Sequence, residues 1–188
     1  MKALISERLR TSRLIAERMA PEHEPELARL ALDPRVHPTL WPFPYPPTEA
    51  DVHDGLQRQL SLWERHGFGL WLLRDRATGE FVGRGGLEYT DALGRLSIEL
   101  AWAIVPERWG QGLATELARA AVRTGFDELG VSELVALTLP HNAASRRVME
   151  KVGFTYDRDI VHAALPHVLY RLARPPGGGS AGTRRRRC

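Results

Sequence analysis

A turn with two glycines stands directly before a helix-favouring run in PERWGQGLATELARAA, residues 106–121. Where a turn opens a helix, the first backbone N–H groups have no partner inside the helix and point outward beside the positive end of its dipole. Gly110 and Gly112 carry no side chain that would keep a bulky anion away, and Ala114 is nearly as small. The turn is therefore predicted to bind a diphosphate. A tight connection without a ligand is the alternative that the two glycines alone leave open.

The glycine turn fits neither of the two best-known phosphate-binding motifs. The mononucleotide P-loop needs a lysine followed by Ser or Thr after its last glycine, and GQGLAT contains no lysine. The dinucleotide fingerprint needs GxGxxG in a parallel βαβ unit. This turn reads GxGxxT and follows three stretches that are expected to form antiparallel strands. A different phosphate-bearing ligand is therefore expected.

The elements that position this turn follow from hydrophobic periodicity. A strand is predicted over residues 13–19, and helices are predicted over 25–32 and from Thr48 to Arg65. Six prolines between Pro34 and Pro47 predict a loop between the two helices, with Trp41, Phe43 and Tyr45 as its aromatic residues.

Short strands and two further helices make up the rest of the predicted domain. Three antiparallel strands are expected over 68–74, 80–90 and 96–105, before the turn. A helix over 112–129, a strand over 132–139, a helix over 141–153 and closing strands over 154–159 and 167–173 follow it. This order predicts one α+β domain over residues 1–174, with a mixed, mostly antiparallel sheet flanked by helices. A Gly/Arg-rich tail over 175–188 is predicted to be disordered.

Composition narrows the classes of function. The only cysteine is Cys188, and the seven histidines form no HxxxH or HExxH pair, so no metal site is predicted. The formal charge of +3 depends on Arg184–Arg187; without them 22 basic residues face 23 acidic ones, which does not indicate a nucleic-acid-binding surface. The charged N-terminus and the lack of an 18-residue apolar run predict a cytoplasmic protein with no membrane partner. Contact of the tail with nucleic acid, or with a membrane through a lipidated Cys188, stays open.

Three motifs in order, IELAWAI, WGQGLATE and PHNAASRRVMEKVGF, resemble the Gcn5-related N-acetyltransferase (GNAT) family. The resemblance runs from TSRLIAERM to HVLYRLA and is closest to the branch that acetylates the N-termini of ribosomal proteins. It implies an enzyme that transfers the acetyl group of acetyl-coenzyme A (acetyl-CoA) directly to a primary amine, with a protein α-amino group as the leading acceptor. A small-molecule amine such as a polyamine or antibiotic, and a non-catalytic acyl-CoA-binding module, are the alternatives. A homodimer stays open.

The same resemblance assigns the coenzyme-binding residues. Backbone N–H groups from Gln111 through Thr115 would hold the diphosphate, and the backbone of Ile104 and Val105 would pair with the pantetheine arm, which Asn142 would also bind. Trp109 stands where the family often has Gln or Arg. Asn142 is also a good helix N-cap with Ser145 in the first turn, so a purely structural role is the alternative. The predicted binding residues are Ile104, Val105, Trp109, Gly110, Gln111, Gly112, Leu113, Ala114, Thr115, Asn142 and Ser145.

The predicted catalytic residues are Glu99, Ser145 and Glu88. By resemblance, Ser145 would protonate the leaving thiolate, because the position of the family's usual tyrosine is Met149 here. An α-amino group needs only about 1.4 kcal/mol to lose its proton at pH 7, whereas a lysine needs about 4.6 kcal/mol. Glu99, on the strand leading to the turn, and Glu88, on the preceding strand, are the carboxylates predicted to accept this proton. Either glutamate could instead be a solvated strand residue.

Overall fold

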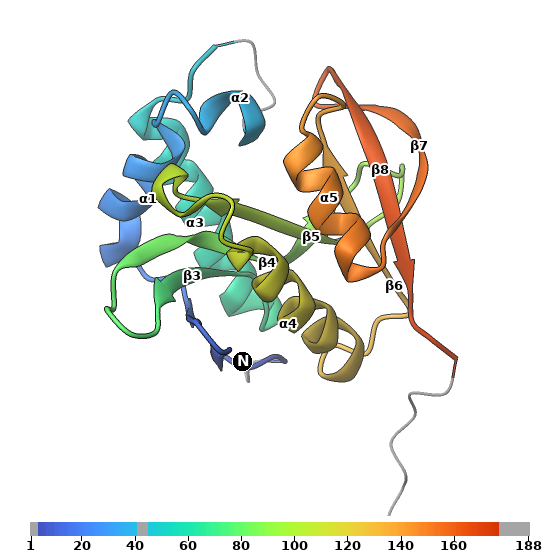
Figure 1. The fold of residues 1–188 in the computed structure, drawn as a ribbon, viewed down its shortest axis with the longest axis horizontal. Helices are drawn as coiled ribbons and strands as arrows, with labels where there is room; N and C mark the ends of the chain where they lie inside the picture. The colour runs from blue at the N-terminus through green and yellow to red at the C-terminus, as the bar shows by residue number, and fades with distance from the viewer. Residues whose placement is uncertain (1–3, 41–44, 177–188) are drawn as a thin grey trace, which may run out of the picture.

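A single eight-stranded sheet runs through the molecule (Figure 1). The structure is a computed structural model that describes residues 4–40 and 45–176. Trp41, Phe43 and residues 177–188 of the predicted tail lie outside this part. The strand order is β1-β2-β3-β4-β5-β6-β8-β7, and every neighbouring pair is antiparallel except β5 and β6, which confirms the predicted mixed sheet. The strands are β1 (Arg8–Arg10), β2 (Leu14–Arg18), β3 (Leu70–Asp75), β4 (Phe81–Thr90), β5 (Ser97–Ile104), β6 (Glu133–Thr138), β7 (Thr155–His162) and β8 (Leu165–Ala173).

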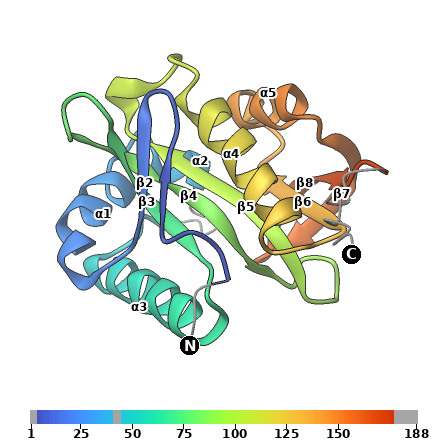
Figure 2. The ribbon, with the colours of Figure 1, turned by 90° about the horizontal axis from the view of Figure 1, so that it is seen from below.

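Helices cover both faces of the sheet. Figure 2 shows α1 and α3 on one side and α4 and α5 on the other. The helices are α1 (Glu24–Ala31), α2 (His37–Leu40), α3 (Glu49–His66), α4 (Leu113–Asp127) and α5 (Ala143–Val152), with 3-10 turns at Pro21–His23 and Pro106–Arg108. None of the helices in the described ranges is long and apolar enough to cross a membrane.

Two elements differ from the sequence-based expectation. The proline-rich segment was expected to be loop throughout, but it contains the short helix α2, in which Pro38 occupies the second position. A proline near the start of a helix costs no hydrogen bond, because the N–H that it lacks has no partner there. Strand β1 was not predicted, and it forms by pairing Arg8–Arg10 with residues 15–17 of β2.

The helix predicted to begin at Thr48 opens with a capping box. The Thr48 side chain accepts a hydrogen bond from the Asp51 backbone N–H (3.3 Å), and the Asp51 carboxylate accepts one from the Thr48 N–H (2.8 Å). Gly67 ends the helix in the left-handed conformation, with φ of 68°. Val52, Leu56 and Trp63 are buried, so α3 is fixed against the sheet along its whole length.

The parallel contact between β5 and β6 is short. Glu99 and Val135 are the only residues that pair across these strands in the described chain. Beyond Glu99, β5 continues to Ile104 while β6 runs separately to Thr138. The sheet therefore opens between the two strands, on the side where the glycine turn begins.

The N-terminal hairpin is tied to the start of α4 through Glu116. Its carboxylate accepts hydrogen bonds from the Thr11 hydroxyl (2.6 Å), the Ser12 hydroxyl (3.0 Å), and the backbone N–H and Nε of Arg13 (both 2.7 Å). Arg13 also donates to the carbonyl of Gln111 (2.8 Å), inside the glycine turn. Burial alone would raise the pKa of Glu116, but these hydrogen bonds outweigh it and lower the pKa to about 2.

Glu116→Gln is expected to lower the free energy of unfolding by about 2 kcal/mol at pH 7, because several hydrogen bonds to a charged carboxylate are weakened together. The unfolded pKa is near 4.5 and the folded pKa is lower, so this contribution is present above about pH 4.5 and is lost as the pH falls toward 2. Urea denaturation of wild type and variant at pH 6 and pH 3 measures it, with the exposed Glu64→Gln as control. A difference as large at pH 3 as at pH 6 contradicts this role.

Candidate active site

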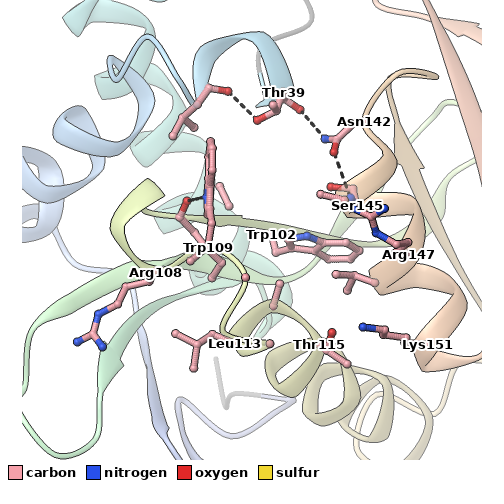
Figure 3. Close-up of a pocket in the computed structure, with 18 residues that line it drawn as sticks. Thr39, Trp102, Arg108, Trp109, Leu113, Thr115, Asn142, Ser145, Arg147 and Lys151 are labelled. Atoms are coloured by element: carbon pink, nitrogen blue, oxygen red, sulfur yellow. Dashed lines mark hydrogen bonds between the residues drawn. The ribbon is translucent and has the colours of Figure 1, made fainter.

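A cavity of about 340 Å³ opens where β5 and β6 separate (Figure 3). Its walls come from the end of β5, the glycine turn, the first residues of α4, one side of α5 and the α2 segment. Nine of the eleven predicted coenzyme-binding residues line it: Ile104, Trp109, Gly110, Gly112, Leu113, Ala114, Thr115, Asn142 and Ser145. Residues that are far apart in the sequence therefore meet around one space.

The glycine turn has the geometry of an anion site. Gly110 and Gly112 both have positive φ values, 75° and 76°, which residues other than glycine adopt only with strain. The first hydrogen bond of α4 runs from the Glu116 N–H to the Gly112 carbonyl (3.0 Å). The N–H groups of Leu113, Ala114 and Thr115 therefore have no partner inside the helix, as expected at a helix start. Gln111 belongs to this turn, but its side chain is exposed and does not line the cavity.

The predicted cap at the start of α5 is present and faces the cavity. The Asn142 side-chain oxygen accepts a hydrogen bond from the Ser145 backbone N–H (3.1 Å). The Asn142 amide donates to the Thr39 carbonyl of α2 (3.5 Å), which links the two walls of the cleft (Figure 3). Capping and ligand contact are compatible here, because the cap uses one lone pair of the Asn142 side-chain oxygen and the bond to Thr39 uses one of the two N–H donors of its amide.

Two cations of α5 also line the coenzyme cavity, and sequence reasoning missed them. Arg147 and Lys151 lie one helical turn apart (Figure 3), and the i, i+4 spacing was the available signal. Arg108, which precedes the turn, instead forms ion pairs with Asp75 (3.2 Å) and Glu80 (2.9 Å). The free positive charge beside the cavity therefore comes from α5.

The end of β5 is already hydrogen-bonded within the chain. The Ile104 carbonyl accepts a hydrogen bond from the Trp109 indole (2.7 Å). The Val105 N–H donates to the Val82 carbonyl (2.9 Å), and the Val105 carbonyl accepts from the Arg108 N–H (3.0 Å). Val105 is buried and does not line the cavity, so its predicted pairing with a pantetheine arm stays a prediction.

A second cavity, of about 220 Å³, adjoins the first and holds the predicted acid–base residues. Glu88 of β4 and Glu99 of β5 lie directly opposite each other as cross-strand partners, and both line this second cavity. Ser145, Trp102 and Thr39 line both cavities. A reactant in each cavity would therefore meet the other beside Ser145.

The two carboxyl groups are held differently. Glu88 accepts a hydrogen bond from the side-chain amide of Gln59 in α3 (2.7 Å). The pKa of Glu99 is raised to about 8, first by burial and then by the charge of Glu88, while a hydrogen bond with Thr90 offsets part of the rise. Glu99 is thus a carboxyl group that exchanges a proton near neutral pH.

Two histidines that sequence reasoning did not assign also line the second cavity. The rings of His162 and His167 lie 5.7 Å apart, nearly perpendicular. Nδ1 of His167 lies 3.1 Å from the Leu165 carbonyl, so it carries the proton and leaves Nε2 as an acceptor. Burial lowers the pKa of His167. No signal in the local sequence placed these strand residues near Glu99, since β8 reaches the site only through its pairing with β6.

The sequence model for the acetyltransferase (GNAT) domain matches residues 13–155 of this chain. The chain belongs to the GNAT family. The match covers the glycine turn, Glu88, Glu99 and the start of α5, so all the residues that form the walls of the coenzyme cavity lie within it. Among the described residues there is no group of three or more His, Cys, Asp or Glu that could hold a metal ion.

Relatives and solved structures agree with this family. The chain is 35% identical over 157 residues to the FsC-acetyl coenzyme A-N(2)-transacetylase of Aspergillus fumigatus, covering 79% of this chain and 65% of that protein. This chain spans less than two thirds of the length of that relative and of a second curated relative, from Bacillus subtilis. A GnaT-family acetyltransferase from Bordetella pertussis has a TM-score of 0.76 at 25% identity, covering 89% of this chain and all of the other. RimL, a ribosomal L7/L12 α-N-protein acetyltransferase in complex with coenzyme A, shares the fold, with a TM-score of 0.73 at 17% identity over 89% of this chain and 98% of the other.

Gly110→Ala and Gly112→Ala are each expected to lower the free energy of unfolding by about 1 kcal/mol, because alanine is strained at positive φ. Each is also expected to weaken coenzyme A binding about tenfold, measured by calorimetry, because the strain is relieved by turning the N–H groups away from the ligand.

Gly94→Ala is the matched control. Gly94 has a φ of 67° and open space around it, but it lies in the β4–β5 turn and lines none of the cavities described here. It should lose the same stability and keep the wild-type affinity for coenzyme A. Equal affinity in all three variants would argue against a diphosphate at the turn.

Proposed function

We propose that this chain transfers the acetyl group of acetyl-CoA directly to a primary amine, and that the acceptor is a protein N-terminal α-amino group. The observation that carries the proposal is the junction of the two cavities at Ser145, with an unpaired helix start in one and Glu99 in the other. One space suits a phosphate-bearing coenzyme, and the adjoining one suits a group that must lose a proton.

The coenzyme end would be held largely by backbone. The free N–H groups of Leu113 to Thr115 would bind the diphosphate, and Arg147 and Lys151 would add positive charge. Asn142 would hold the pantetheine arm, whose thioester would then lie near Ser145. With both reactants bound, the positioning itself supplies much of the rate advantage.

The reaction needs one proton removed and one supplied. The amine nitrogen attacks the thioester carbon, the amine proton passes to Glu99 directly or through water, and the C–S bond breaks. The thiolate takes a proton from Ser145, which regains one from the protonated Glu99 through water, or takes it from water in the same chain, which gives an amide and free coenzyme A. Because a thiol with a pKa near 8.5 forms a stable thiolate, a weak acid such as a serine hydroxyl is sufficient.

The pKa of Glu99 supports an α-amino acceptor. A protein α-amino group has a pKa of about 7.7 to 8, so its proton transfer to a group with a pKa of about 8 is nearly balanced. The same transfer from a lysine-like amine near 10.4 is uphill by about 3 kcal/mol. This difference favours the branch that acts on protein N-termini over a polyamine acceptor.

A small molecule with an α-amine is the second candidate. The name of the Aspergillus relative describes transfer to an N(2) group, at 35% identity to this chain, and a small amine would fit the 220 Å³ cavity as well. The cytoplasmic location, the assignment of residues 1–174 as the whole domain and the homodimer remain parts of the prediction.

A screen for thiol release separates these acceptors. Purified protein with acetyl-CoA is expected to release coenzyme A with a lysine-free peptide that has a free N-terminus. The same peptide with a blocked N-terminus and one added lysine should be inactive. Activity with small amines alone would assign the second candidate, and saturable coenzyme binding without release from any amine would indicate a binding module.

The pH dependence tests the base. With a peptide acceptor, kcat/KM is expected to rise up to about pH 8, because Glu99 accepts a proton only when ionised. Glu88→Gln removes the negative charge that raises this pKa, so it should move the rise to lower pH, while the titration of the amine itself is unchanged. Glu99→Gln should lower kcat/KM about 100-fold and abolish the rise with pH that is due to ionisation of Glu99. If the pH profile of Glu88→Gln is the same as that of the wild type, Glu99 is not the base.

A further inference from the structure

Two arginines without ion pairs converge on a third cavity, of about 170 Å³, between α1, α3 and β4. Arg84 of β4 is partly buried and lines both this cavity and the one that holds Glu99. Arg58 of α3 lines only the third cavity. Neither guanidinium has a hydrogen bond or an ion pair with any residue in the described part of the chain. Burial lowers the pKa of Arg84, and the nearby charge of Arg58 lowers it further, against the attraction of Glu88.

The carboxylates around the same cavity are hydrogen-bonded by neutral donors, and the two arginines act on them only through their charge, Arg58 on Asp51 and Arg84 on Glu88. Glu88 is held by Gln59 (2.7 Å), and Asp51 is held by the backbone N–H and hydroxyl of Thr48 (2.8 and 2.6 Å). The third cavity therefore has two guanidinium groups that no described residue binds, that of Arg84, which is partly buried, and that of Arg58, which is exposed. A partly buried guanidinium without a partner is costly, and an anionic ligand would remove that cost.

The strand register gives the spacing of the backbone positions that carry Arg84 and the proposed base. Arg84 pairs with Ala103, and Glu88 pairs with Glu99, so the two positions lie four residues apart along the same face of the sheet. At about 3.3 Å per residue, this separates the Cα positions of Arg84 and Glu88 by roughly 13 Å. Both side chains line the cavity that holds Glu99, so a peptide whose amine lies beside Glu99 would bring one of its next residues to Arg84.

We propose that Arg84, assisted by Arg58, binds a carboxylate of the acceptor, and that the acceptor is a peptide with an acidic side chain at its second or third residue. This inference rests on the proposed function, because it places the reacting amine beside Glu99. The peptide would run from the junction at Ser145 past Glu88 toward α3. Arg84 would then select the acceptor rather than take part in the acetyl transfer.

Matched peptides test this selection. Wild-type protein is assayed by thiol release with lysine-free peptides that have Glu or Gln at position 2, and Glu or Gln at position 3. One of the two positions is expected to favour Glu over Gln by about 10- to 100-fold in kcat/KM, the range of a hydrogen bond to a charged group. Free glutamate and glutamine form a small-molecule arm, and neither should approach the rate of the better peptide.

Variants assign the preference to the cavity. Arg84→Gln is expected to reduce the Glu/Gln ratio to less than about threefold, with coenzyme A binding by calorimetry as the measure of correct folding. Arg84→Lys should keep part of the ratio, and Arg58→Gln should reduce it by a smaller factor. Arg65→Gln is the matched control, because Arg65 lies on the same helix, is exposed and does not line the cavity.

The outcomes separate the two proposals. If no amine releases thiol, the proposed function fails. If peptides are acetylated but Glu and Gln are equivalent at both positions, or if Arg84→Gln keeps the full ratio, only the anion site is overturned. Faster turnover of free glutamate than of any peptide would assign the cavity to a small-molecule acceptor and overturn the peptide proposal.

Discussion

Strands β5 and β6 pair at a single position, Glu99 with Val135, and the cleft depends on this brief parallel contact. β5 is paired with β4 and β6 with β8, both in antiparallel fashion, so the sheet stays continuous although it opens between β5 and β6. The opening exposes the end of β5 to one cavity and its carboxylate-bearing face to the other. A longer parallel ladder would fill this space with main-chain hydrogen bonds and leave no room for two reactants to meet.

The face of β4 and β5 that carries Glu88 and Glu99 gives up some folding stability for groups that can bind or react. Burial makes a charge on Glu99 costly, and repulsion by Glu88 directly opposite adds to the cost, so Glu99 keeps its proton to a higher pH. The protein reduces this cost only in part, through Gln59 on Glu88 and Thr90 beside Glu99. Strained or unpaired polar groups of this kind are unusual in a core and tend to gather where a protein binds or reacts. Arg84, on the same face, belongs to the same pattern.

The sequence predicted most of this arrangement because its local signals are strong. The Thr48 cap, the glycines before α4 and the Asn142 cap each require a particular residue for a particular backbone shape, and each appears in the structure. What the sequence could not predict depends on long-range pairing. His167 reaches the second cavity because β8 pairs with β6, and Arg108 is directed away from the glycine turn by acids on β3 and in the following turn. The hydrophobic periodicity of a single segment does not show which strand it will pair with.

The link between the N-terminal hairpin and the glycine turn bears on where the folding unit begins. The family match starts at residue 13, whereas Thr11 and Ser12, which donate to Glu116, come before it, and β1 starts at Arg8. A chain trimmed to the matched region would retain every residue that lines the 340 Å³ coenzyme cavity, but it would lose β8, the two histidines of the second cavity, and half of the donors that fix the start of α4. The region that matches the family is thus shorter than the stable unit, and shortened versions made for crystallisation should begin before Arg8.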